Sequence, residues 1–236
     1  MGLRRLIQLF ALFFLFVSFA SCNSKTVASD TNATVANAEP AAPVKDSLDT
    51  GIIITSVVSK MDGAQSYALY LPKAYSAGTS LPVIIFFDPQ GDGTVPLNLY
   101  TGLAEEFGFI LIGSNTSKNG MDLQQAKAIA DNLVNEAESR FTVNKKKITL
   151  CGFSGGAKVA LAAAAANPAV STVIYCGAAL PVSPLHTLDF LGFAGTGDMN
   201  YTDVVSFNEG LKNSQHLHYL VEWNGKHEFP TAIVFR

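Results

Sequence analysis

The sequence predicts an α/β protein with a mostly parallel, twisted sheet of about eight strands, helices on both faces and no lid domain. Short apolar runs recur from residue 52 onward without alternating polar residues, as expected of strands buried on both faces. Segments with helical periodicity fall between these runs, and turn residues separate them. The predicted strands are 52–58, 67–71, 83–87, 109–112, 148–151, 172–176, 190–193 and 219–223.

One strand and two helices are the clearest of these elements. Residues 83–87 form an apolar run that ends before Asp88-Pro89. Residues 126–137 repeat apolar residues at spacings of three and four, which predicts an amphipathic helix. The alanine-rich segment 156–166 predicts a buried helix that ends at Asn167-Pro168, because helices rarely continue through proline.

The N-terminal residues have the pattern of an export signal. Arg4 and Arg5 precede an apolar stretch over residues 6–20, which is too short to cross a bilayer of ~30 Å as a helix. Residues 1–21 are therefore predicted to be a signal peptide. Residues 19–22, Phe-Ala-Ser-Cys, resemble the lipobox of bacterial lipoproteins, which implies lipidation of Cys22. The alternative is an ordinary signal peptide in which Cys22 has no special role.

Residues 22–50 are predicted to be a flexible tether between this signal and a globular body over residues 51–236. The segment is rich in Ala, Ser, Thr, Asn, Asp and Pro and has almost no large apolar residue before Leu48. A lipidated Cys22 would attach the body to a membrane through this tether. The expected location is the bacterial cell envelope, on the periplasmic or the surface face.

Charge and cysteine content exclude several classes of function. Sixteen Lys and Arg against nineteen Asp and Glu give a net charge of −3, which argues against a nucleic-acid partner. Cys151 and Cys176 fall inside predicted strands, where packing as small apolar residues explains them. No residue spacing suggests a metal site. The glycine-rich segments match neither a phosphate-binding loop nor a dinucleotide fingerprint, so no cofactor is predicted.

The segment Gly152-Phe153-Ser154-Gly155-Gly156 joins a predicted strand to a predicted helix. A G-x-S-x-G sequence in this position places a serine on a tight turn, with its hydroxyl above the sheet and a helix N-terminus beside it. Small neighbours are needed there because adjacent backbones must pass close together. Ser154 is therefore the candidate nucleophile.

A nucleophilic serine needs a base and a carboxylate that orients the base. His227 follows the last predicted strand in a polar loop, whereas His186, His216 and His218 lie where structural or solvated roles explain them better. Asp198 lies at the tip of the preceding predicted strand. The candidate triad is therefore Ser154, Asp198 and His227, in that order along the chain.

This order of groups on alternating strands and helices resembles the α/β-hydrolase fold, and in particular compact secreted bacterial carboxylesterases and esterase-like depolymerases. The resemblance covers residues 52–236 and rests on three motifs, GFSGG at 152–156, GTGDMNY at 195–201 and WNGKHEFP at 223–230. It implies that Ser154 is the nucleophile, His227 the general base and then acid, and Asp198 the residue that orients His227.

The resemblance also implies an oxyanion hole made of two backbone N–H groups. One belongs to Gly155, the residue after the nucleophile. The other is expected in the loop after the third strand, where Pro89 has no N–H, so Gln90 is the first candidate and Gly91 the second.

Two further features distinguish the chain from larger relatives. Only about a dozen residues separate Ala178 from Phe190, where larger lipases insert a lid, so an open site is expected. The chain also ends nine residues after His227, where relatives usually have a closing helix. The two interpretations are a truncated product and a helix that is naturally missing, and the second predicts that an apolar flank of the sheet lies bare.

The resulting expectation is a serine hydrolase that cleaves a carboxylic ester, in a small molecule or a polymer side group, through an acyl-enzyme. A serine peptidase, a thioesterase, and a non-catalytic binding module on a hydrolase scaffold are the alternatives. Tyr100, Met199 and Tyr201 are possible lining residues that packing explains equally well. The sequence does not name the substrate, because specificity depends on the shapes of the loops after the strands.

Overall fold

The structure is a computed structural model that describes residues 48–235. The predicted signal peptide (1–21), the Cys22 lipid anchor and nearly all of the predicted tether (22–50) lie outside the described residues. They therefore stay predictions.

The described residues form one eight-stranded sheet in the order β1-β2-β4-β3-β5-β6-β7-β8. β2 pairs antiparallel with both β1 and β4, and all other neighbouring strands are parallel, so the predicted mostly parallel sheet is confirmed. The strands are β1 Ile53–Val58, β2 Ser66–Tyr70, β3 Leu81–Phe87, β4 Ile110–Ser114, β5 Val143–Phe153, β6 Thr172–Cys176, β7 Asp189–Gly195 and β8 His218–Trp223.

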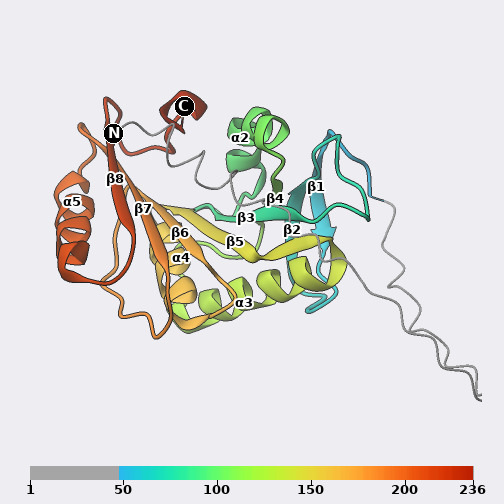
Figure 1. Cartoon of the computed structure of the whole chain (residues 1–236), viewed down its shortest axis with the longest axis horizontal. Helices are drawn as coiled ribbons and strands as arrows, with labels where there is room; N and C mark the ends of the chain where they lie inside the picture. The colour runs from blue at the N-terminus through green and yellow to red at the C-terminus, as the bar shows by residue number, and fades with distance from the viewer. Residues whose placement is uncertain (1–47, 236) are drawn as a thin grey trace, which may run out of the picture. The chain divides into compact units, whose positions relative to one another are not determined.

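Helices cover both faces of this sheet (Figure 1). Helices α3, Leu123–Arg140, α4, Gly155–Ala166, and α5, Tyr201–Gly210, pack on one face. Helix α2, Thr94–Phe107, packs on the other face together with the short 3-10 helix η2, Ala232–Phe235. A second 3-10 turn, η1 over Leu211–Asn213, follows α5.

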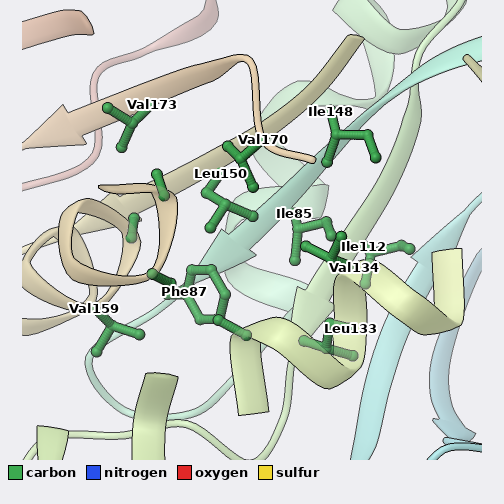
Figure 2. Close-up of a cluster of buried hydrophobic side chains, with 14 of the residues drawn as sticks. Ile85, Phe87, Ile112, Leu133, Val134, Ile148, Leu150, Val159, Val170 and Val173 are labelled. Atoms are coloured by element: carbon green, nitrogen blue, oxygen red, sulfur yellow. The ribbon is translucent and has the colours of Figure 1, made fainter. Parts of the chain in front are cut away.

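The strands are apolar on both faces because each face has its own core. Along β3, Val83, Ile85 and Phe87 point toward α3 and α4, while Ile84 and Phe86 point toward α2. This arrangement explains why the sequence shows continuous apolar runs instead of alternation. Figure 2 shows the larger core, in which side chains of β3, β4 and β5 meet side chains of α3 and α4, among them Ile85, Phe87, Ile112, Leu133, Val134, Ile148, Leu150 and Val159.

Helix α2 is the element that sequence reasoning missed. Gly102 lies in its interior and lowers the helix propensity of the segment, whereas Pro96 lies in its first turn, where proline is tolerated. Its buried residues Leu97, Tyr100 and Ala104 nevertheless follow a spacing of three and four. Gly108, in the left-handed conformation at φ 71°, ends the helix. Together these features are the signal that could have predicted it.

The last described residues pack on the α2 face, although they form no closing α-helix. Phe229 is buried there, and the carbonyl of Pro230 accepts a hydrogen bond of 2.6 Å from the Tyr100 hydroxyl. Ala232 and Val234 pack against the same small core, and Val221 of β8 remains only partly buried. The sheet is therefore partly covered at the position where a bare flank was expected.

No helix between residues 48 and 235 is both long and apolar enough to span a bilayer. The connection from β6 to β7, residues 177–188, contains neither helix nor strand.

Candidate active site

Ser154 occupies a strained turn between β5 and α4. Its backbone has φ 54° and ψ −122°, and no other non-glycine residue among the described ones has a positive φ. A side chain in this region costs on the order of 1–3 kcal/mol, so the surrounding structure must hold it there. The backbone N–H of Ser154 donates to the Cys176 carbonyl at 2.9 Å, which ties the turn to the end of β6.

The flanking glycines are required by the close approach of three backbone segments. A Cβ on Gly152 would lie 2.1 Å from the carbonyl oxygen of Gly156, and one on Gly156 would lie 2.0 Å from that of Phe87. The turn can therefore form only if both positions lack a side chain. The predicted need for small residues around Ser154 is confirmed.

The structure brings the three predicted triad residues together from loops after β5, β7 and β8. Nε2 of His227 lies 2.9 Å from Oγ of Ser154. On its other side, Nδ1 of His227 lies 2.9 Å and 3.0 Å from the two carboxylate oxygens of Asp198. The Asp198 side chain is only 2% exposed and that of His227 is 25% exposed, so the imidazole is reachable while its carboxylate partner is not.

Neighbouring loops hold Asp198 and His227 in place. The N–H of Asn200 donates to Oδ1 of Asp198 at 2.8 Å, and the Asn200 amide donates to the Gly177 carbonyl at 2.8 Å. A Cβ on Gly177 would lie 2.9 Å from Oδ2 of Asp198, so only glycine leaves room for the carboxylate. The ring of Phe153 packs on the imidazole with a centroid distance of 4.7 Å.

The expected oxyanion donors differ in their surroundings. Gly155 is the first residue of α4, and its N–H has no acceptor in the preceding turn. In contrast, the N–H of Gln90 donates to Oδ2 of Asp88 at 2.7 Å, and that of Gly91 donates to the Asp88 carbonyl at 3.1 Å. Both candidates in this loop are therefore engaged within it.

A pocket of about 410 Å³ opens beside Ser154. The elbow, which is the turn at residues 152–156, contributes to its wall together with the loop from β4 to α3 and the loop from β6 to β7. The lining residues include Asp88, Ser117, Lys118, Asn119, Met121, Leu123, Ser154, Gly155, Lys158, Val159, Leu180 and Asn200.

Sequence reasoning missed the wall formed by residues 117–121. These residues follow the carboxyl end of β4, at the same edge of the parallel strands as the elbow, and this position is the signal that could have pointed to them. Asn200 also went unassigned, although it lies inside the GTGDMNY motif. Lys158, another lining residue that went unassigned, lies four residues after Ser154 and therefore about one turn along α4.

The three aromatic or apolar residues left open by the sequence do not line this pocket. Tyr100 is buried under the C-terminal segment, Met199 is 81% exposed, and the Tyr201 hydroxyl donates to Glu222. Packing or surface contacts account for all three.

The other histidines and the cysteines lie elsewhere. The rings of His186 and His218 contact backbone carbonyls, and that of His216 packs on Phe190. Cys151 and Cys176 are buried free thiols, and burial raises the pKa of the Cys151 thiol well above its ordinary value. Among residues 48–235, no cluster of three or more His, Cys, Asp or Glu could hold a metal ion.

Comparison with protein-family models and with curated proteins finds no match for this sequence. Solved structures do resemble it. A feruloyl esterase module from Clostridium thermocellum, a serine-to-alanine variant bound to sinapinate, has a TM-score of 0.60 at 11% identity, over 75% of this chain and 82% of that one.

Two other solved structures resemble the chain to a similar degree. A candidate dienelactone hydrolase from Klebsiella pneumoniae has a TM-score of 0.58 at 18% identity, over 75% of this chain and 88% of that one. Thermogutta terrifontis esterase 2, phosphonylated by sarin, has a TM-score of 0.57 at 14% identity, over 75% of this chain and 86% of that one. The strand order, the helices on both faces and these likenesses together show that the chain has the α/β-hydrolase fold.

Proposed function

We propose that this protein is a serine hydrolase that cleaves carboxylic esters through an acyl-enzyme on Ser154. The main support for the proposal is that the imidazole of His227 lies 2.9 Å from both Ser154 and Asp198, and that Ser154 occupies a strained strand-to-helix turn. If His227 had only a structural role, nothing would explain why Ser154 is held in a backbone conformation that costs stability. The esterases among the structural neighbours support the ester as substrate.

The proposed reaction follows from the geometry of the three side chains. Nε2 of His227 takes the proton of the Ser154 hydroxyl as Oγ attacks the ester carbonyl, and the carbonyl π electrons move onto oxygen. The N–H of Gly155 donates to this oxyanion. When the intermediate collapses, the C–O bond to the alcohol breaks and His227 returns the proton to the leaving alkoxide.

The second half of the reaction reuses the same groups. Water attacks the acyl-enzyme carbonyl while His227 takes its proton, and collapse releases the carboxylic acid and restores the Ser154 hydroxyl. The carboxylate of Asp198 contacts Nδ1 throughout and stabilises the imidazolium that forms in each half.

We further propose that the enzyme acts at the cell envelope, attached to a membrane through a lipid on Cys22. The basic start, the short apolar stretch and the lipobox-like residues 19–22 support export and lipidation. An open pocket on a tethered domain would suit esters presented outside the cytoplasm.

The direct test is intact-mass analysis after exposure to a fluorophosphonate, which reacts with activated serines. The parent chain should gain one adduct, and Ser154→Ala should gain none and lose ~10⁶-fold in kcat on 4-nitrophenyl acetate. Ser206→Ala, which removes an exposed hydroxyl on α5, is the matched control and should label like the parent. A folded parent chain that takes no adduct and hydrolyses no ester would exclude the proposed function.

A further inference from the structure

We propose that the side-chain amide of Asn119 is the second donor of the oxyanion hole, beside the backbone N–H of Gly155. This inference rests on the proposed ester hydrolysis. It assigns a side chain, in place of a backbone N–H of Gln90, to the position that completes the hole.

The Asn119 side chain lies directly against the residue after the nucleophile. A Cβ built on Gly155 would fall 1.8 Å from Oδ1 of Asn119, 2.9 Å from its Cγ and 3.4 Å from its Nδ2. The amide group therefore occupies the space that a side chain at position 155 would fill. It also lines the same pocket as Ser154 and Gly155.

The local backbone explains why Asn119 points to this place. The N–H of Met121 donates to the Lys118 carbonyl at 3.3 Å, and Gly120 has φ 83°, which together describe a type II turn with Asn119 at its second position. The N–H of Asn119 itself donates to the Pro89 carbonyl at 2.9 Å. The turn after β4 is thus fixed to the loop after β3, and both contribute residues to the pocket wall.

A second contact fixes the two loops to each other. The N–H of Gly93 donates to the Asn115 side chain at 3.0 Å, and the Asn115 amide in turn donates to the Thr55 carbonyl at 2.9 Å. Both the oxygen and the nitrogen of the Asn115 side chain are therefore engaged in structural hydrogen bonds. Asn119 differs from it in this respect.

The Asn119 amide is available to a ligand. No hydrogen bond described between residues 48 and 235 uses its side chain, which is exposed in the pocket wall. The N–H groups of Gln90 and Gly91 are instead engaged by Asp88. Of the four donors compared, the N–H groups of Gly155, Gln90 and Gly91 and the Asn119 amide, only the first and the last need no described bond broken before they reach substrate.

The chemistry requires only donation and no transfer of a proton. As Ser154 attacks, the carbonyl π electrons move onto oxygen, and a donor aimed at this oxygen stabilises the negative charge more than the neutral ester. Rotation about the Cβ–Cγ bond exchanges Oδ1 and Nδ2 of Asn119, and this terminal torsion has a broad, two-fold preference. A substrate oxygen would select the orientation in which the N–H group faces it.

Two substitutions at position 119 separate donation from packing. Asn119→Ala should lower kcat on 4-nitrophenyl acetate by ~10²–10³-fold with little change in KM. Asn119→Asp keeps the shape but has no N–H, and its negative charge should lower kcat at least as far. Gln124→Ala, an exposed amide removed from the start of α3, is the control and should match the parent.

A double-mutant cycle with Gly155 sharpens the test. Gly155→Ala keeps its backbone N–H, but its Cβ would displace the Asn119 amide, so kcat should fall about as far as in Asn119→Ala. Because both changes remove the same donor, the double variant should be no slower than either single variant. Affinity for a trifluoromethyl ketone, which mimics the tetrahedral intermediate, should fall by the same factor as kcat/KM.

The outcomes distinguish this inference from the proposed function. If the parent chain hydrolyses the ester and Asn119→Ala and Asn119→Asp keep kcat within threefold, the inference is wrong and the proposed function stands. If kcat falls but the ketone affinity does not, Asn119 has a structural role only and the inference is also wrong. If the parent takes no fluorophosphonate adduct and hydrolyses no ester, both are overturned.

Discussion

Asp198 and Glu136 are both buried carboxylates, but their hydrogen bonds differ in kind. Asp198 contacts a histidine whose far nitrogen lies 2.9 Å from a reactive hydroxyl beside a pocket. Glu136 on α3 is completely buried and accepts hydrogen bonds from five groups, the Ser59 hydroxyl, the Lys60 and Met61 N–H groups, the Tyr67 hydroxyl and the Arg140 guanidinium.

The difference shows that burial of a charge does not by itself indicate a site. The partners of Glu136 come from the connection between β1 and β2, from β2 and from α3, so this carboxylate joins one edge of the sheet to the helix that covers it. None of these five partners is a histidine, the side chain whose charge ordinarily changes near neutral pH. The imidazole beside Asp198 can instead gain and lose a proton at Nε2.

The largest effect is expected from Asp198→Asn. An asparagine amide would donate to Nδ1 of His227 and leave the ring proton on Nε2, where it cannot accept from Ser154, so kcat should fall ~10⁴-fold. Measurement of kcat on 4-nitrophenyl acetate, together with the unfolding temperature, tests this. Asp203→Asn, an exposed acid on α5, is the control. A kcat within tenfold of the parent would remove Asp198 from the proposed mechanism.

Substitution of Glu136 should instead lower the stability of the fold and leave kcat unchanged. Glu136→Ala removes a fully buried carboxylate from beside the Arg140 guanidinium, which is only 10% exposed, and should lower the free energy of unfolding by about 3–5 kcal/mol. The value of kcat for the folded fraction should not change. Urea unfolding followed by circular dichroism measures the first quantity and an assay well below the transition measures the second.

The same helix offers a matched control for this experiment. Glu138 pairs with Lys145 at 3.6 Å near the surface, and Glu138→Ala should cost less than about 1 kcal/mol. Equal losses from Glu136→Ala and Glu138→Ala would mean that the buried cluster contributes nothing special to the stability of the fold.

The smallest effect concerns pH. Burial alone raises the pKa of the Glu136 carboxyl, but hydrogen bonds from Arg140, Lys60, Ser59 and Tyr67 outweigh it and hold the pKa below its ordinary value. The stabilisation is therefore complete above the ordinary pKa of a glutamate and is lost as pH falls through the lowered pKa of the folded state.

Urea unfolding at neutral pH and at several acidic values tests this sign. The difference in unfolding free energy between the parent chain and Glu136→Ala should shrink steadily as the pH falls below the ordinary pKa of glutamate. A difference that grows on acidification would contradict the lowered pKa.

Sequence reasoning was most successful where the signal is local. The apolar runs at 172–176 and 83–87 predicted β6 and the core of β3, because period and burial are properties of a few consecutive residues. Gly102 made α2 harder to predict, because there packing on the sheet outweighs weak helix propensity. Sequence alone also left open whether Tyr100 and Met199 line the site, because the exposure of a side chain depends on which other segments of the chain cover it.

The sequence by itself determined the layered α/β class, the glycine-flanked turn at Ser154 and the order of Ser154, Asp198 and His227, because each follows from patterns within one strand, turn or loop. Only the tertiary structure decided which loops meet at the pocket. It gives the N–H of Gln90 to Asp88 and lays the Asn119 amide on Gly155. Such contacts join segments far apart in the chain, and their geometry depends on the order and the twist of the strands in the sheet.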